Sequence, residues 1–550
     1  MALRDHTSDA VHWYMQELSS RVVAETGIPS DRHHLGKLIL RGLKDDPEFI
    51  LMIDGATDEK ENFRSTLKRS VQCATAFRKF GIKHGDVILL MAPNHIHLTI
   101  PMYAALYIGA GVAGIDMTLG VNELHETFKF NQPKIIFCQK EREDDVESAL
   151  KGLQFNSKIV TFNGSDKNIN FSDFLNKYGA DGSVDDFKAT DFDPSETISL
   201  LIATSGTTGL PKSAAVTHKN FAVSVPYMWA MYDKFPTPTP LTIVFSPIQW
   251  YSALFQFVFS PIIRHTRLQS SLPMTQEHAY GIINKYKPRY AMASPNMLTS
   301  FFKAGERDKC DFSCFEVILA GGSAVLPGLI EEIRVASPNT QLVVIYGMSE
   351  ISGIAFNFNS TLPTSLGRAL QSINYKLVNP ETLKEVTEPN KAGELWIKGP
   401  GVFKGYYNNP EVTSQVLVEG GWVRTGDMVR RDENFNFYFV ERLKLLLKYR
   451  NHQISPLEIE SVIAKHPSVF EVAVTGVPHK EHGDLPIAFV VLYKGHKISE
   501  QEIKDLVKDE LTDSKQLRGG VVFLETMPLT TTSKVNRQKL AAIAKSMKID

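Results

Sequence analysis

Apolar and polar positions alternate along the chain in a way that predicts an α/β fold. Residues 63–80 carry apolar side chains at helical spacing, and residues 87–91 form a short apolar run typical of a buried strand. The same order of helix and strand recurs between residues 100 and 137. Because strands joined through helices form crossover units, we expect a large N-terminal domain with mostly parallel sheets. Residues 1–60 are too weakly patterned to predict an element.

The pattern changes near residue 440. Residues 435–440 alternate like a strand, and we place a boundary after them, with one domain at 1–440 and another at 441–550. A unit of about 110 residues is an ordinary size for a small domain. Strands are expected at 445–449, 470–477 and 487–493, and Ser455 and Ser499 each open a helix with a capping box. We therefore predict a small α+β C-terminal domain.

The composition is that of a globular protein, since 43% of the 550 residues are hydrophobic and 22% are charged. A formal net charge of −1 argues against a nucleic-acid partner. No apolar run is long enough to span a bilayer and the first residues lack a signal-peptide core, so we expect an intracellular chain without a transmembrane segment, with the cytoplasm favoured. The four cysteines are scattered, so no zinc site is expected. The oligomeric state stays open.

Residues 204–212, with the sequence TSGTTGLPK, predict a phosphate-binding loop after an apolar strand. Glycines allow the backbone to approach a ligand, while amide and hydroxyl groups surround an anion and a lysine adds charge. The loop is not a Walker loop, because Leu210 and Pro211 separate its last glycine from its lysine. An ordinary surface turn is the alternative. The predicted ligands are Thr204, Ser205, Gly206, Thr207, Thr208, Gly209 and Lys212.

Further candidates follow predicted strands. Tyr346 offers a flat face to a purine, and Glu350 offers an anionic oxygen to Mg²⁺. Asp427 can accept the two hydroxyl groups of a ribose. A glycine turn at 321–322 comes at the end of a strand, where ligands bind in open α/β sheets. The apolar stretch 241–259 is either core or the wall of an apolar acid pocket, and both interpretations stay open.

These elements, in this order, resemble the adenylate-forming (AMP-binding) enzymes: acyl-CoA synthetases, coumarate–CoA ligases, beetle luciferases and peptide-synthetase adenylation domains. The resemblance extends from Phe63 to Arg537. It rests on the loop 204–212, the aromatic-Gly-x-Ser-Glu element 346–350, the glycine-marked segments 393–397 and 405–407, the GW…TGD element 421–427 and the closing loop 528–537. It implies that a carboxylic acid and MgATP form an acyl-adenylate and pyrophosphate, and that CoA then takes the acyl group.

The resemblance also implies a role for each candidate. The loop 204–212 would bind pyrophosphate, Glu350 with Thr208 would bind Mg²⁺, and Lys534 would bridge the carboxylate and α-phosphate during adenylation. Lys448 would serve the thioester step, so the small domain would rotate about a hinge at Glu441 and Arg442. The remaining nucleotide ligands would be Tyr346, Gly347, Ser349, Asp427 and Arg442, and the acyl pocket would be lined by Trp250, Gly321, Gly322 and Ala355.

The chain departs from the family pattern at several positions. Gln249 and Trp250 stand where the family has a histidine, and Glu441 replaces the usual hinge aspartate. Glycines of the family are replaced by Ser213, Asn451 and Ser533. Since every charged catalytic position is filled, we expect an active acyl-CoA synthetase for an apolar acid such as a fatty acid.

Two alternatives remain. The first is a luciferase-like monooxygenase that acts through an adenylate, and the second is a catalytically weakened protein that binds an acyl group or nucleotide. The family also makes a peroxisomal location conceivable, but the sequence ends in Lys-Ile-Asp and not in the common Ser-Lys-Leu signal.

Overall fold

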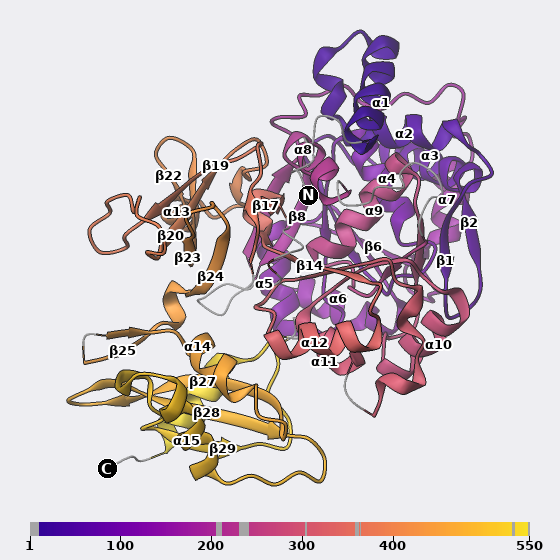
Figure 1. Cartoon of the computed structure of the whole chain (residues 1–550). Coiled ribbons are helices and arrows are strands. Elements are labelled where there is room, and N and C mark those ends of the chain that lie inside the picture. The colour runs from indigo at the N-terminus through magenta and orange to yellow at the C-terminus, as the bar shows by residue number, and fades with distance from the viewer. Residues whose placement is uncertain are drawn as a thin grey trace.

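Two largely parallel β-sheets build the N-terminal part of the molecule (Figure 1). The computed structural model describes residues 10–204, 212–229, 241–302, 305–357, 362, 365–450, 452–530 and 534–547. The strands of the first sheet, in order, are β14 (Gln341–Ile345), β13 (Val317–Gly321), β12 (Tyr290–Ala293), β10 (Leu241–Val244), β11 (Thr266–Gln269), β1 (Ile50–Asp54) and β2 (Lys60–Asn62). Of these strands, β2 alone runs antiparallel to its neighbour in the sheet.

The second sheet combines parallel strands with an antiparallel edge. Its order is β21 (Gly405–Tyr406), β9 (Lys212–Thr217), β8 (Ile198–Thr204), β4 (Gly111–Gly114), β3 (Val87–Met91), β5 (Ile135–Cys138), β6 (Lys158–Thr161) and β7 (Ile169–Asn170). The pairs β21–β9 and β9–β8 are antiparallel, and the other pairs are parallel. The α/β class expected from the helix–strand alternation is confirmed.

Helices cover both faces of these sheets, as parallel strands require. Along β3, Ile88 and Leu90 face one hydrophobic core, whereas Val87, Leu89 and Met91 face another. The first core lies between the two sheets and contains α1 (Ala10–Thr26), α2 (Leu35–Asp45), α3 (Phe63–Lys79), α4 (Thr99–Ile108), α7 (Phe171–Gly179), α8 (His218–Trp229) and α9 (Tyr251–Ile263). The outer faces carry α5 (Val121–Asn131) and α6 (Glu143–Leu150) on one sheet, and α10 (Gln276–Tyr286), α11 (Pro295–Phe302) and α12 (Pro327–Ala336) on the other.

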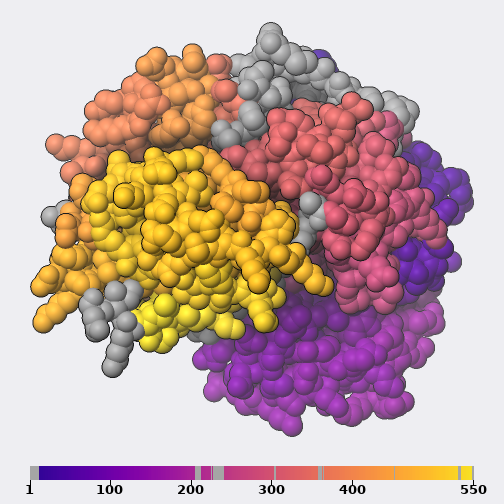
Figure 2. Space-filling model, turned by 60° about the horizontal axis from the view of Figure 1, so that its bottom comes forward, coloured from indigo at the N-terminus to yellow at the C-terminus, as the bar shows by residue number. Residues whose placement is uncertain are grey.

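An antiparallel sheet forms a separate lobe, drawn in orange in Figure 1, which we call the β-lobe. It consists of β19 (Asn374–Val378), β20 (Gly393–Lys398), β23 (Trp422–Arg431), β22 (Leu417–Val418) and β24 (Phe437–Arg442). The strand predicted at 435–440 begins only at Phe437, because Phe435 takes a left-handed φ of 62° in the preceding turn. Figure 2 shows the yellow C-terminal domain lying against this lobe.

The C-terminal domain has a hydrophobic core of its own, as expected for a small α+β unit. Its sheet contains β26 (His452–Ile454), β25 (Leu447–Tyr449), β28 (Gly483–Leu492), β27 (Val469–His479) and β29 (Gly520–Phe523), with helices α14 (Pro456–Ile463), α15 (Glu500–Glu510) and α16 (Arg537–Ser546). The strand predicted at 445–449 is shorter, because residues 443–445 form a 3₁₀ turn, η7 (Leu443–Leu445). The boundary at 440/441 stays a prediction.

The two predicted capping boxes have different outcomes. Ser499 accepts a hydrogen bond from the Glu502 N–H and Glu502 closes the box, as predicted. The capping box at Ser455 is wrong, because the Ser455 hydroxyl donates to the Val440 carbonyl at 3.0 Å. The first turn of α14 is capped instead by Glu441, whose Oε2 accepts the Leu457 N–H at 3.1 Å.

Candidate active site

The candidate residues with charged or aromatic side chains meet where the first sheet, the β-lobe and the C-terminal domain come together. Tyr346 directly follows β14, and Glu350 lies in the next turn, η6 (Ser349–Ile351). Asp427 on β23 and Arg442 at the end of β24 are paired residues of adjacent antiparallel strands. The carboxyl ends of parallel strands are the usual ligand sites of α/β sheets, as the sequence predicts for this region.

Asp427 is a buried carboxylate held by two neighbours. Asp427 is only 3% exposed, and its Oδ2 accepts a hydrogen bond from the Tyr346 hydroxyl at 2.6 Å. Arg442 Nε lies 3.2 Å from Oδ1, yet Oδ1 accepts no hydrogen bond from the described residues. Burial raises the pKa of Asp427, against the opposing charge of Arg442. In turn, the charge of Asp427 raises the pKa of Arg442. Oδ1 is therefore an acceptor without a hydrogen bond at the edge of the site.

Glu350 is held in place by a tyrosine. The residue is 8% exposed, and its Oε1 accepts the Tyr406 hydroxyl at 2.6 Å. Burial and the adjacent carboxylate raise the pKa of Tyr406, so this hydroxyl stays a donor. The Lys212 ammonium lies 5.4 Å from the centre of the same ring, a cation–π arrangement. One tyrosine thus links the carboxylate predicted to bind Mg²⁺ to the lysine of the phosphate loop.

Lys534 reaches the site from the C-terminal domain. The side chain is half-buried, and its pKa is lowered by burial and then by Arg442, while Asp427 and Glu350 oppose this shift. The charges of Asp427, Arg442 and Glu350 all act on the pKa of Lys534, so its ammonium lies within electrostatic range of these three groups, which are far apart in the sequence.

Two residues of the site were missed in the sequence. Tyr406 was recognised only as part of a glycine-marked turn, and Lys444 only as part of the domain boundary. Burial and then the charge of Lys444 lower the pKa of Lys212, so Lys444 lies within electrostatic range of Lys212. In the sequence, the position of Lys444 two residues after Arg442 was the signal that could have identified it. With Lys444 included, four cations, Lys212, Arg442, Lys444 and Lys534, lie around this region.

The phosphate loop connects two antiparallel strands. Thr204 and Lys212 are paired at the ends of β8 and β9, and the Thr204 hydroxyl donates to the Lys212 carbonyl at 3.3 Å. The loop therefore leaves the sheet and returns to it at adjacent points. The predicted ligands Ser205, Gly206, Thr207, Thr208 and Gly209 lie outside the described residues, as do Asn451 and Ser533.

The acyl-pocket candidates lie on different elements. Gly321 ends β13, where an added Cβ would be 2.5 Å from Ile345 Cγ1, so the close β14 strand requires glycine. Gly322 has a left-handed φ of 96° and faces open space. Trp250 precedes α9 and is partly buried, and Ala355 is buried. From Ala253 to Ile263 every residue of α9 is buried, so most of the apolar stretch is core.

Other site candidates sit near the turn after β14. Gly347 pairs with Ile354 in the β15 (Gly347–Met348) and β16 (Gly353–Ile354) hairpin, where an added Cβ would be 2.4 Å from the Gly353 carbonyl oxygen. Ser349 opens η6 and its carbonyl accepts the Ser352 N–H at 3.1 Å. Close backbone contact therefore requires a glycine at position 347, and its contact with the nucleotide stays a prediction.

The second lysine predicted to be catalytic lies on the surface of the C-terminal domain. Lys448 is exposed on β25, where its backbone N–H donates to Asp484 Oδ2 at 3.0 Å. Glu441, the predicted hinge residue, is 3% exposed, and burial raises the pKa of its carboxyl group. Through the cap on α14 it joins the end of the β-lobe to the C-terminal domain. The structure thus has Lys534 facing the site and Lys448 elsewhere.

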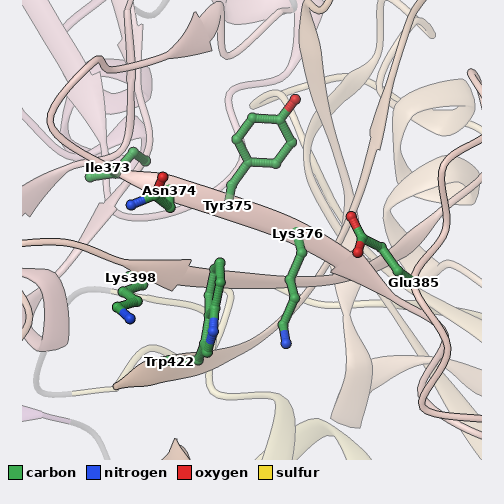
Figure 3. Close-up of a pocket in the computed structure, with 7 residues that line it drawn as sticks. All are labelled: Ile373, Asn374, Tyr375, Lys376, Glu385, Lys398 and Trp422. Carbon is green, nitrogen blue, oxygen red and sulfur yellow. The ribbon is translucent and has the colours of Figure 1, made fainter. Parts of the chain in front are cut away.

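A separate hollow of about 550 Å³ lies on the β-lobe (Figure 3). Its lining residues are Ile373, Asn374, Tyr375, Lys376, Glu385, Lys398 and Trp422. In Figure 3 Lys376 and Trp422 lie on one side of the strands, whereas Tyr375 points to the other side. Lys376 Nζ is 4.4 Å from the Trp396 ring and 4.6 Å from the Trp422 ring, so aromatic faces already enclose it. Trp422 of the GW…TGD element thus lines this hollow, while Asp427 contributes to the site.

The residues present suit a magnesium nucleotide. Mg²⁺ is commonly held by one or two carboxylates together with substrate phosphates and water, and Glu350 supplies one such carboxylate. Among the described residues, no group of three or more His, Cys, Asp or Glu side chains forms a metal site by itself. Asp427 Oδ1 is a buried acceptor without a hydrogen bond among the described residues, and the cations of this region favour phosphate. Within the described ranges, no helix combines the length and apolar character needed to cross a membrane.

Comparisons with known proteins give the following matches. A model described as AMP-binding enzyme matches residues 41–407, and one described as AMP-binding enzyme C-terminal domain matches residues 458–534. A luciferin 4-monooxygenase of Photuris pensylvanica is 28% identical over 512 residues, covering 89% of the chain and 91% of that protein. A 4-coumarate–CoA ligase of Arabidopsis thaliana is 26% identical over 521 residues, covering 91% and 89%. The crystal structure of the anthranilate CoA ligase AuaEII in complex with anthranoyl-AMP has a TM-score of 0.84 at 21% identity, covering 93% of the chain and 97% of that chain.

Proposed function

Since the chain belongs to the AMP-binding enzyme family of adenylate-forming enzymes, we propose that it is an AMP-forming acid–CoA ligase. It activates a carboxylic acid with MgATP, releases pyrophosphate and transfers the acyl group from acyl-AMP to CoA. The observation that carries this proposal is the buried group of Tyr346, Asp427 and Arg442, joined by a 2.6 Å hydrogen bond and a 3.2 Å ion pair at the predicted ribose position. Lys534 of the C-terminal domain lies within electrostatic range of this group and of Glu350.

In the first half-reaction, the large domain binds the nucleotide. Asp427 accepts a ribose hydroxyl at Oδ1, while the Tyr346 hydroxyl and Arg442 keep the carboxylate in place. Lys212 and the loop that precedes it bind the leaving pyrophosphate. Glu350, oriented by Tyr406, holds Mg²⁺. When bound, this ion neutralises charge on the phosphates and favours departure of pyrophosphate.

Lys534 acts where two anions must approach each other. A carboxylate attacks the α-phosphate only if their mutual repulsion is offset, and a half-buried ammonium supplies that charge without reorganisation of solvent. Burial and Arg442 lower the pKa of Lys534, while Asp427 and Glu350 oppose this shift because their negative charges favour the ammonium form. The role of Lys534 is therefore electrostatic, and no covalent step is assigned to it.

In the second half-reaction, the CoA thiol attacks the acyl carbon and AMP leaves. Lys448 serves this step after the C-terminal domain rotates about Glu441 and Arg442. The exposure of Lys448 supports two orientations of the C-terminal domain, because in the present one Lys534 faces the site while Lys448 faces solvent. A site with both ammonium groups at one α-phosphate would be disfavoured by their repulsion.

The acid is proposed to be apolar. Trp250 is partly buried at the start of α9, whose body is apolar core, and Gly322 faces open space at the end of β13. A large indole in place of the family's histidine would shorten or bend the acyl slot, so medium-chain fatty acids are preferred to very long ones. Thr208 remains proposed as a second group near the metal.

A luciferase-like monooxygenase is the second candidate, because the relative from Photuris pensylvanica is a luciferin 4-monooxygenase. Both functions pass through an acyl-adenylate and differ afterwards. The test is pyrophosphate release with a panel of fatty and aryl acids, with and without CoA, while light emission is recorded. Acid-dependent pyrophosphate and a CoA thioester support the ligase, light without a thioester supports the second candidate, and nucleotide binding without pyrophosphate indicates a binding protein.

A further inference from the structure

A buried ion pair lies at the base of the segment that carries Lys534. Arg537 is the first residue of α16 and follows Lys534 by three positions. Its Nη1 lies 2.8 Å from Glu460 Oε1, and its Nη2 donates to Glu460 Oε2 at 3.1 Å. Such a paired contact between a guanidinium and a carboxylate fixes orientation as well as distance. Glu460 is only 4% exposed, so water competes little with this pair.

Both members of the pair are also tied to the central sheet of the domain. Arg537 Nη1 donates to the Val474 carbonyl at 2.7 Å, and Glu460 Oε1 accepts the Val474 N–H at 2.7 Å. Val474 lies within β27, while Glu460 lies on α14. The ion pair therefore connects α14, β27 and α16 at one point. Because α14 is capped by Glu441, this point is one short helix away from the predicted hinge.

The segment that carries Lys534 directly precedes Arg537 of this ion pair. We call residues 528–530 and 534–536 the two arms of the Lys534 hairpin. Leu529 and Val535 pair in antiparallel fashion, the Thr530 N–H donates to the Lys534 carbonyl at 2.7 Å, and the Asn536 N–H donates to the Pro528 carbonyl at 2.7 Å. The second arm ends at Arg537. Any rotation of the Arg537 backbone is thus transmitted through this ladder to Lys534.

We propose that Glu460 and Arg537 are positioning residues for adenylation, which hold the Lys534 hairpin so that its ammonium faces Asp427 and Glu350. This inference rests on the proposed function. The Lys534 ammonium has no direct ion pair among the described residues, and the charge of Arg442 disfavours it at this place. Its placement therefore depends on the base of the hairpin, and misplacement by about 1 Å can lower a rate about 100-fold.

The main variant is Glu460→Gln, which keeps the shape and the acceptor for the Val474 N–H but removes the charge facing Arg537. Its matched control is Glu458→Gln on the same helix, which breaks the surface pair between Glu458 and Lys515. Arg537→Lys tests for partial rescue, because lysine keeps the charge but lacks the paired geometry. Each variant is measured in both half-reactions, with acyl-AMP supplied for the second.

We expect Glu460→Gln to lower the turnover of adenylation about 10- to 100-fold with little change in KM for ATP. Thioester formation from supplied acyl-AMP should stay within about twofold of the unaltered protein, since Lys448 serves that step. The control Glu458→Gln should match the unaltered protein in both half-reactions. The adenylation turnover of Arg537→Lys should lie between those of Glu460→Gln and the unaltered protein. Equal losses in both half-reactions, or an unchanged adenylation turnover, would overturn the positioning role.

A second readout needs neither ATP nor turnover. The pH dependence of amine labelling at Lys534, followed by mass spectrometry, gives the pKa of this lysine. In the unaltered protein and the control it should lie below the ordinary lysine value, because of burial and Arg442. In Glu460→Gln it should return toward the ordinary value as the lysine leaves the site, whereas loss of a nearby negative charge alone would lower it. An unchanged or lowered pKa overturns the proposal even if no acid is ever activated.

Discussion

Replacing Asp427 with asparagine keeps the shape of a buried group and removes its charge. In the structure Oδ2 already accepts the Tyr346 hydroxyl, and Oδ1 is the oxygen without a hydrogen bond among the described residues. The substitution therefore removes about one charge-assisted hydrogen bond to the ribose, worth about 1.5–3 kcal/mol. That range corresponds to about 10- to 150-fold weaker ATP binding.

Asp427→Asn should weaken ATP binding without lowering protein stability. Burial raises the pKa of Asp427 above its unfolded value, so its contribution to folding is present at low pH and is lost as pH rises through the folded pKa. At neutral pH Asp427→Asn should therefore not lower the thermal midpoint. ATP needs the ionised carboxylate, so affinity in the unaltered protein should fall as pH drops through that pKa. The variant should lack this dependence.

The assay is calorimetric titration with ATP and with 2′,3′-dideoxy-ATP, with Glu385→Gln on the outer face of the same lobe as the matched control. The unaltered protein and the control should both lose affinity for the dideoxy nucleotide. Asp427→Asn should distinguish the two nucleotides much less, because a neutral amide oxygen accepts the ribose hydroxyls more weakly than a carboxylate does. If Asp427→Asn still prefers ATP by the full factor, Asp427 does not bind the ribose.

Three further predictions follow from the proposed roles. A chain ending at Val440 should still bind MgATP in a calorimeter without turning over, and a folded fragment without nucleotide binding would contradict this division. Lys534→Ala should abolish acyl-AMP formation and spare thioester formation from supplied acyl-AMP, while Lys448→Ala should do the reverse; failure of both variants in the same half-reaction would exclude two arrangements. Trp250→Ala should extend the chain length of accepted acids, and an unchanged chain-length profile would remove Trp250 from the pocket.

Periodicity predicted the sheets better than the ends of their strands. The run 87–91 became β3 because its apolar side chains fill two cores at once, a pattern visible in the sequence. The first 60 residues were not predicted, although they contain α1, α2 and β1. In α2 the buried residues Leu35, Leu38, Ile39 and Leu43 recur at helical spacing, so this helix had a local signal that the sequence analysis missed. The position of Phe435 in a left-handed turn depends on the hairpin around it.

Site residues could be predicted where they belong to a motif on one segment. They could not be predicted where their role depends on a contact between two segments that are distant in the sequence. Tyr346, Glu350 and Asp427 could be selected because each follows a strand or a glycine turn in the family's order. The bond between Tyr406 and Glu350 spans 56 positions and has no local signal. Ser455 has the sequence of a capping box, yet Glu441 of β24 accepts the Leu457 N–H at the start of α14, a contact over 16 positions that has no local signal.

The most direct test of the account is mass spectrometry of the reaction with MgATP and an acid panel, first without CoA and then after CoA is added. We expect acyl-AMP to accumulate with at least one apolar acid and to be replaced by acyl-CoA and AMP when CoA is supplied. ATP binding without acyl-AMP for any acid, or acyl-AMP that persists unchanged in the presence of CoA, would contradict it.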